Sequence, residues 1–282
     1  MSGIVICSAK GSPGVTTLTC ALGAVWPAER AVVVAECDPG GGDIAAWFGL
    51  SVQRGMTDLV LTGRQGVRTD YRTQVQRLPG GLEVLVSPTG AASASALGRE
   101  LAMSGRPIVP PECDLLVDCG RLAPGAAGQE AVIRTGDDVL LLVRPDVAGV
   151  AHAQGAHQRL IELSSSPVAV VIAGTGRFSP AEVSRELDTD VLDVMPDDPR
   201  GAAMVGGGPG RPREFARCAL VTFARRLVSA LVPSSGSASR AAAEDAAAAV
   251  ERTELAFDPR DLDRRNERET VVDLSAVASD AR

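Results

Sequence analysis

A single lysine is the first residue in this sequence that could do specific chemistry. Lys10 is the only lysine in a chain of 282 residues, and it opens the glycine-rich loop Lys10–Thr17 with the sequence KGSPGVTT. An ammonium group is a compact ligand for phosphate. The loop follows the apolar run Ile4–Cys7 and precedes a helix-like segment, so backbone N–H groups and a helix N-terminus can surround an anion there. A coding bias toward arginine, or a turn used only for tight packing, would also account for these residues.

The loop contains most of what a phosphate site requires. Gly11 and Gly14 allow backbone conformations that a Cβ would block. The hydroxyls of Thr16 and Thr17 fall where they would meet a magnesium ion and an inner phosphate. In the usual P-loop, G-x-x-x-x-G-K-[ST], a lysine follows the second glycine. Val15 occupies that position here.

The loop resembles the deviant Walker A motif, K-G-G-x-G-K-[ST]-[ST], of the MinD/ParA family of P-loop ATPases. Lys10 matches the signature lysine, which in that family reaches across a nucleotide-bound dimer to the partner's phosphates. Val15 replaces the second lysine, which binds phosphate within its own subunit. The resemblance implies ATP and Mg²⁺ as cofactors, with Lys10 as a catalytic residue. The nucleotide-binding residues that it implies in the loop are Lys10, Gly11, Ser12, Gly14, Val15, Thr16 and Thr17.

A second match is the sequence Glu36-Cys37-Asp38-Pro39, which follows the apolar run Ala31–Ala35. It resembles the family motif D-x-D-P, in which the second aspartate lies near the magnesium and the attacking water. Asp38 matches that aspartate and is therefore implied as a second catalytic residue. Glu36 replaces the first aspartate and keeps its charge.

The third match is the apolar run Leu115–Asp118, which ends in an acid as a Walker B strand does. There Asp118 would hold magnesium through water. Taken alone, an acid at a strand end more commonly caps or turns the chain. With the three motifs in order, the resemblance implies Thr16, Asp38 and Asp118 as the metal-binding residues.

The segments that must position these residues alternate between strand and helix. Short, continuous apolar runs are typical of buried parallel strands, and helix-like segments separate most of them. This pattern predicts an α/β fold, a doubly wound, mostly parallel sheet of about seven strands flanked by helices, as in the P-loop NTPases. In such a sheet, Lys10, Asp38 and Asp118 fall at the carboxyl ends of strands, where ligands bind. The predicted strands are Ile4–Cys7, Ala31–Ala35, Leu82–Val86, Leu115–Asp118, Val139–Val143, Val168–Ala173 and Val191–Met195, and the helices include Val15–Trp26, Asp146–Leu163 and Pro180–Leu187.

The resemblance covers roughly residues 1–232 and reaches the last predicted strand. The sequence from Val194 to Pro199 looks like the family's final strand and the loop beside the base, so Pro196 is implied as a nucleotide contact. Family members often carry an asparagine after the sixth strand to read adenine. Residues 173–176 hold Ala-Gly-Thr-Gly there instead, which leaves phosphate binding better supported than adenine specificity.

Composition excludes several classes of protein. About 230 residues suit one nucleotide-binding domain, and no run approaches the ~20 apolar residues of a membrane span. The six cysteines lack C-x-x-C spacing, which favours reduced thiols in the cytoplasm over disulfides or zinc. A net charge of −7 argues against avid general DNA binding. The arginines of residues 211–226 could still form a local basic face for DNA, or simply a solvated helix surface.

The composition changes after residue 232. Residues 233–282 are rich in Ser, Ala and alternating charges, and we expect this tail to be mostly disordered. Its apolar patch Val271–Val277 could dock a partner, although an inert, solvated tail explains it equally well.

The function that these features favour is an ATP-binding dimeric switch of the MinD/ParA type that positions a cargo. We expect a homodimer through the nucleotide face and slow hydrolysis, because Val15 removes a phosphate ligand. Arg144 or Arg200 could replace the lost charge. The partner could be ParB-like, with DNA as cargo, or belong to a polar pilus or secretion apparatus. The alternatives are a pseudo-ATPase scaffold dimer that does not turn over nucleotide, and a metabolic P-loop enzyme of the dethiobiotin synthetase type, for which no substrate residues are evident.

Overall fold

The computed structural model describes residues 3–10, 13–64, 70–110 and 112–232. Gly11, Ser12 and the predicted tail, with its patch Val271–Val277, lie outside the described residues. The strands are β1 Gly3–Ser8, β2 Val32–Glu36, β3 Gln76–Arg77, β4 Glu83–Leu85, β5 Asp114–Arg121, β6 Asp138–Val143, β7 Val168–Ala173 and β8 Val191–Met195. The α-helices are α1 Val15–Ala24, α2 Ile44–Phe48, α3 Met56–Arg64, α4 Ala91–Ser104, α5 Ala127–Thr135, α6 Val147–Leu163, α7 Pro180–Leu187, α8 Pro199–Val205, α9 Pro212–Arg217 and α10 Ala219–Leu231; a 3-10 turn spans Tyr71–Thr73.

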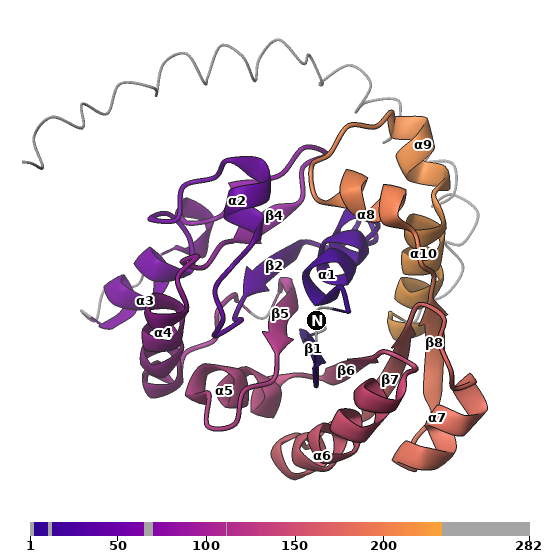
Figure 1. Ribbon diagram of the computed structural model, residues 1–282. Coiled ribbons are helices and arrows are strands. Elements are labelled where there is room, and N and C mark those ends of the chain that lie inside the picture. The colour runs from indigo at the N-terminus through magenta and orange to yellow at the C-terminus, as the bar shows by residue number, and fades with distance from the viewer. Residues whose placement is uncertain (1–2, 11–12, 65–69, 111, 233–282) are drawn as a thin grey trace, which may run out of the picture.

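The eight strands form one sheet in the order β3-β4-β2-β5-β1-β6-β7-β8, with helices on both faces (Figure 1). Every neighbouring pair is parallel except β3 and β4. The chain runs outward from β1 to one edge, returns to β5 beside β1, and then continues to the other edge. This arrangement confirms the predicted doubly wound P-loop NTPase-like fold, with β1 at the point where the two halves of the sheet meet.

All of the predicted strands are present, and β3 is an additional one. β3 has only two residues, Gln76 and Arg77, and it pairs antiparallel with β4 at the sheet edge. Edge residues that face solvent do not need an apolar run, so the pattern that revealed the buried strands was missing there. Helix α1 ends at Ala24, two residues before the predicted end at Trp26, because Pro27 disfavours helical geometry in the residue before it.

Two hydrophobic clusters, one on each face of the sheet, form the core. Alternate residues of β1 divide between them: Val5 and Cys7 join the cluster beneath α3 to α7, while Ile4 and Ile6 join the cluster beneath α1, α8 and α10. β1 is therefore buried on both faces, which fixes the position of the loop that follows it.

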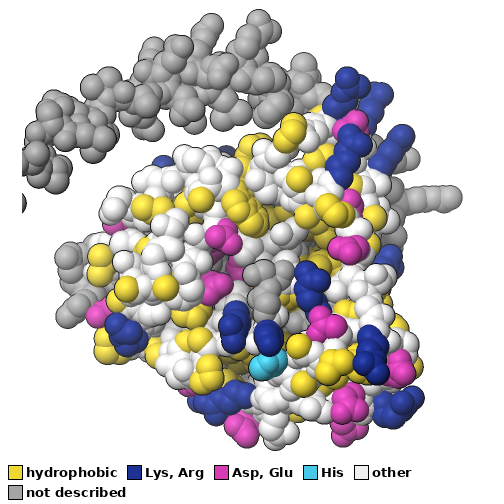
Figure 2. Space-filling model, in the orientation of Figure 1, with side chains coloured by type: hydrophobic (Ala, Val, Ile, Leu, Met, Phe, Trp, Pro, Cys, Tyr) yellow, Lys and Arg dark blue, Asp and Glu magenta, His cyan; other side chains and the backbone are white. Residues whose placement is uncertain are grey.

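Charge is unevenly distributed over the surface. Figure 2 shows Lys and Arg side chains gathered over α9, at the end of the domain that also carries α10.

All six cysteines lie in the described part of the chain and are free thiols. None of the helices that the structure describes is both long and apolar enough to cross a bilayer.

Candidate functional site

The glycine-rich loop connects the central strand β1 to α1. Gly14, directly before the helix, has a φ of 99° that side chains with a Cβ rarely adopt. The helix starts from this residue, because the Leu18 N–H donates to the Gly14 carbonyl at 2.8 Å. Lys10 is exposed at the end of β1, and within the described residues no hydrogen bond or ion pair holds its ammonium group. Both residues lie at the carboxyl edge of the sheet, as the sequence predicted.

Val15 packs as a core residue. Its side chain is 5% exposed and belongs to the hydrophobic cluster that contains Ile6, Leu18 and Met195. The Val15 carbonyl accepts a bond of 2.9 Å from the Thr19 hydroxyl inside α1. The side chain at the phosphate-lysine position therefore stabilises α1 against the sheet, and only its backbone N–H is suited to an anion.

Asp118 connects the glycine-rich loop to the end of β5. Its side chain is 1% exposed, accepts a hydrogen bond from the Thr16 hydroxyl, and accepts the Gly120 N–H at 2.9 Å. The pKa of the Asp118 carboxyl is raised to about 7, mainly by burial. The nearby Glu36 and Asp38 carboxylates contribute to this rise, whereas the bonds from Thr16 and Gly120 oppose it. Thr16 and Asp118, both predicted metal-binding residues, are thus in direct contact.

Asp38 lies beside the same turn. Its half-buried carboxylate accepts the Gly40 N–H at 2.6 Å and the Arg121 N–H. Burial raises the pKa of Asp38, and the two backbone bonds act in the opposite direction. Gly120 makes this approach possible: its φ is 55°, and a Cβ added to it would overlap the Asp38 carboxylate. The second and third motifs therefore meet at one turn.

Glu36 has a role that the sequence did not predict. Its carboxylate is buried, with 1% exposed, and accepts three backbone N–H groups. The donors are Asp43 at 2.7 Å, Ile44 at 2.9 Å and Ser87 at 3.0 Å. Burial raises the pKa of Glu36, and these bonds oppose that rise. The residue that replaces the family's first aspartate thus holds the start of α2 and the chain after β4 in place.

Two arginines flank the end of β1. The register of the sheet pairs Ser8 with Arg121 of β5, and the Leu122 N–H donates to the Ser8 carbonyl at 2.8 Å. On the other side Ser8 pairs with Leu142 of β6, so Arg144 follows that strand beside the loop. The guanidinium groups of Arg121 and Arg144 are exposed, and neither is paired with a carboxylate in the part of the chain that the structure describes. Sequence reasoning missed Arg121, because only the strand register places it next to β1.

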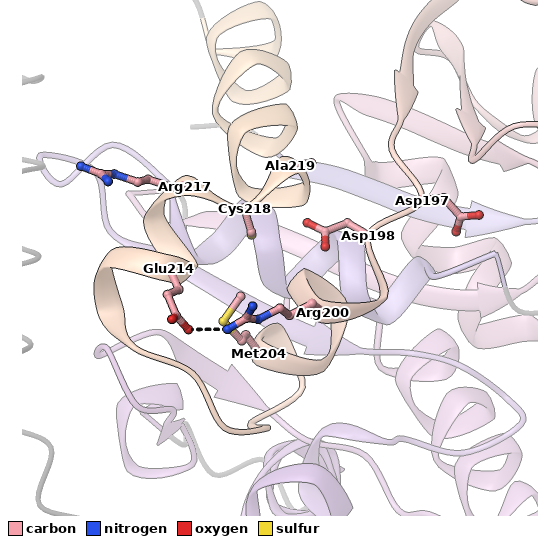
Figure 3. Close-up of a pocket in the computed structure, with 8 residues that line it drawn as sticks. All are labelled: Asp197, Asp198, Arg200, Met204, Glu214, Arg217, Cys218 and Ala219. Carbon is pink, nitrogen blue, oxygen red and sulfur yellow. Dashed lines mark hydrogen bonds and ion pairs between the residues drawn. The ribbon is translucent and has the colours of Figure 1, made fainter.

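Pro196 follows β8 next to a pocket with several charged residues in its lining. The end of β8 lies close to the glycine-rich loop, since a Cβ on Gly14 would lie 3.5 Å from the Met195 Cε. The pocket has a volume of about 330 Å³, and Figure 3 shows its lining side chains, which come from the residues after β8 and from α8, α9 and the start of α10. Its lining residues are Asp197, Asp198, Arg200, Met204, Glu214, Arg217, Cys218 and Ala219.

Three of the pocket residues are engaged in the fold. Asp198 accepts the Gly201 N–H at 2.8 Å and the Leu220 N–H at 3.0 Å, so one carboxylate caps both α8 and α10. Arg200 is paired with Glu214 at 2.9 Å (Figure 3). Arg200 is therefore a poorer substitute for the missing lysine than Arg121 or Arg144.

The described residues of the site suit a magnesium ion that keeps most of its water ligands, and do not suit a metal ion that is coordinated mainly by protein side chains. Within the described ranges, no group of three or more His, Cys, Asp or Glu side chains could hold a metal. The Thr16 hydroxyl and the Asp118 carboxylate are hard oxygen donors in contact. Magnesium commonly keeps several waters and takes one or two protein oxygens together with substrate phosphates. The donor set fits Mg²⁺ arriving with a nucleotide.

Solved structures share this fold at low sequence identity. A ParA family ATPase from Chlorobium tepidum TLS superposes with a TM-score of 0.62 at 14% identity, over 80% of this chain and 98% of that one. MinD from Pyrococcus horikoshii OT3, complexed with Mg-ADP, gives 0.67 at 16%, over 83% and 97%. A variant of McdA from Cyanothece, complexed with ATP, gives 0.58 at 15%, over 82% and 96%. No protein-family model and no curated protein sequence matches the chain.

Proposed function

We propose that this chain, which has the fold of the MinD, ParA and McdA ATPases, is an ATP-binding dimeric switch that positions a cellular cargo. The observation that carries the proposal is the contact between the three motifs at the carboxyl edge of the sheet. Thr16 of the loop donates to Asp118, and the Gly120–Arg121 turn after Asp118 supports Asp38. Burying a carboxylate costs free energy. A loop used only for packing would not require buried carboxylates around its end.

In this proposal each residue acts on a different part of the nucleotide. The backbone at Gly14 and Val15, with Gly11 and Ser12, cradles the phosphates, and the Thr17 hydroxyl contacts an inner phosphate. Thr16 and Asp118 hold Mg²⁺, Asp118 through water, and Pro196 lies beside the base. Bound Mg²⁺ would supply positive charge to the phosphate oxygens. Asp38 is the one carboxylate of the cluster that is partly exposed, so it is the group that can orient an attacking water.

Most of the positive charge that neutralises the nucleotide phosphates must come from side chains outside the glycine-rich loop of the same subunit. Losing a charge-assisted bond to a phosphate costs on the order of 1.5–3 kcal/mol, or roughly ten- to a hundredfold in affinity. Lys10 is exposed and would meet the phosphates of a partner subunit. Arg121 and Arg144, on either side of the loop, would supply further charge within the subunit. Hydrolysis is accordingly slow, because charge stabilisation provides much of the catalysis of phosphoryl transfer.

This arrangement couples nucleotide binding to dimerisation, and the coupling can be measured. If Lys10 acts across the dimer, ATP must favour the dimer by the same factor as dimerisation favours ATP. Titration of the protein with MgATP, followed by light scattering, should show a rise from monomer to dimer mass. Lys10→Ala should abolish that rise, while Arg134→Ala, an exposed control on α5, should not. An equal ATP affinity in monomer, dimer and the Lys10→Ala variant would contradict the proposal.

One observation favours a second function, that of a scaffold dimer without turnover. Val15 is integrated into the hydrophobic core, so the loop has lost the side chain that binds phosphate within the subunit. A scaffold would form dimers that do not respond to nucleotide and release no phosphate. Phosphate release that depends on Asp38 separates the two functions.

The cargo and the location follow from the same proposal. A switch of this type acts in the cytoplasm, where ATP and reduced cysteines are both present. A ParB-like partner with DNA, or a polar pilus or secretion apparatus, would be positioned by the dimer. Purification of the full chain with its bound proteins, in the presence of ATP and then of ADP, would identify the partner that depends on nucleotide.

A further inference from the structure

The C-terminal helices carry a surface charge opposite to that of the whole chain. From Pro199 to Leu231, which spans α8, α9 and α10, the sequence has six arginines and a single acid, although the chain has a net charge of −7. All six arginines are exposed, and Figure 2 shows basic side chains gathered over α9. We define the arginine face as Arg200, Arg211, Arg213, Arg217, Arg225 and Arg226.

Carboxylates of the domain pair with Arg200 and with Arg226. Arg200 contacts Glu214 at 2.9 Å, and Arg226 contacts Asp193 of β8 at 2.7 Å. Both guanidinium groups are exposed, and exposed ion pairs contribute little and exchange readily. These pairs therefore reduce the net charge of the arginine face but leave its side chains accessible to other anions.

Arg217 and Arg225 are paired with no carboxylate of the described residues. Arg225 donates to the Ala216 carbonyl at 2.6 Å, and that acceptor carries no formal charge. Arg217 is exposed, and no carboxylate of the described residues is bonded to it. A mobile anion can reach both side chains without displacing a domain carboxylate.

The chain itself carries an acidic segment shortly after the end of the domain in sequence. Glu244–Glu254 contains four acids and one arginine, and residues 233–243 separate it from the end of the domain. Eleven residues span at most about 36 Å, whereas α10 measures about 20 Å from Leu231 back to Ala219. The segment can therefore reach the arginine face of its own chain, where a tether of this short length gives a local concentration of about millimolar.

We propose that Glu244–Glu254 folds back onto the arginine face and shields it from other polyanions. Its four carboxylates replace solvent and salt at Arg217 and Arg225. Release of the segment, by a competing acidic ligand or by salt, would expose a surface suited to nucleic acid or to an acidic protein. This inference does not depend on nucleotide binding.

The lysine content of the chain permits a direct test by cross-linking. Because Lys10 is the only native lysine, Arg217→Lys in the full chain places one additional side-chain amine on the arginine face. A carbodiimide joins amines to carboxylates at contact distance, and peptide mapping should locate the link between position 217 and Glu244–Glu254. High salt, about 0.5 M, should abolish the link. Arg134→Lys on α5 is the control and should give no such link.

A second measurement tests the shielding itself. A full-chain variant with E244Q, D245N, E251Q and E254Q should bind a labelled DNA duplex about three- to tenfold more tightly than the native chain at ~50 mM salt. The same four substitutions should remove the cross-link in the Arg217→Lys background. Equal DNA affinity of the two chains would mean that the face is already open, and would overturn the proposal. So would links formed only between isotopically distinct copies, or equal links from position 134.

Discussion

The acidic side and the basic side of the candidate site are built in opposite ways. Glu36 and Asp118 are buried and held by hydrogen bonds from the backbone or from Thr16. The side chains of Lys10 and Arg121 are exposed, and no carboxylate of the described residues is paired with either of them. The groups suited to metal and water are thus preorganised within the subunit. In the proposed switch, the groups suited to phosphate charge would be fixed in place only when a ligand or a partner arrives.

The largest expected effect comes from adding a side chain at Gly120, in the turn that supports the acidic side of the site. Gly120→Ala places a Cβ against the Asp38 carboxylate at a φ of 55°, so both steric overlap and backbone strain oppose folding. We expect a loss of about 3 kcal/mol or more in the free energy of unfolding, measured in urea. Gly125→Ala is the matched control, because its φ is 75° with open space around it, and it should lose only about 1–2 kcal/mol. Equal losses in the free energy of unfolding for the two variants would show that steric overlap with Asp38 does not contribute.

The next effect separates the exposed acid from the buried ones. Asp38→Ala should lower the rate of phosphate release by at least ~100-fold, because the only partly exposed carboxylate of the cluster is removed. ATP affinity should change less than about threefold, since the phosphate ligands remain. Asp43→Ala, an exposed acid near the same loop, should leave the rate unchanged. A similar rate for the Asp38 variant and the native chain would remove Asp38 from catalysis.

The buried acid should make stability depend on pH. Because the pKa of Asp118 is raised from 3.8 to about 7 in the folded protein, the folded state binds a proton more tightly than the unfolded state between these values. The free energy of unfolding should therefore fall as pH rises from 4 to 7, by on the order of 2–4 kcal/mol from this group, and then level off. Urea unfolding with a chelator present measures this. Asp118→Asn should flatten the dependence, and an unchanged slope would contradict the assignment.

The smallest expected effect comes from restoring the missing charge. Val15→Lys should tighten ATP binding by the isolated subunit about tenfold, or roughly 1.4 kcal/mol, measured by calorimetry. The nucleotide-free variant should be less stable than the native chain, because Val15 is a core position. Val15→Met, which changes the packing without adding charge, should not improve affinity. If both variants bind alike, phosphate charge is already fully supplied by other residues.

Most of the architecture was predictable because buried parallel strands leave a direct mark on the sequence. The apolar runs from Ile4 to Met195 predicted every parallel strand, and only the short edge strand β3 left no such mark. The three motifs also predicted that Lys10, Asp38 and Asp118 lie at the carboxyl ends of strands. Their side chains could be listed from the sequence, but which of them touch could not.

Local patterns in the sequence were sufficient to indicate the fold, the glycine-rich loop and the replacement of a phosphate lysine by Val15, because periodicity and residue type are local properties. Tertiary packing fixed the role of each charged side chain. It turned Glu36 into a support for three backbone N–H groups, paired Arg200 with Glu214, and brought Arg121 beside β1. These roles depend on the register between strands distant in sequence, which no local pattern encodes.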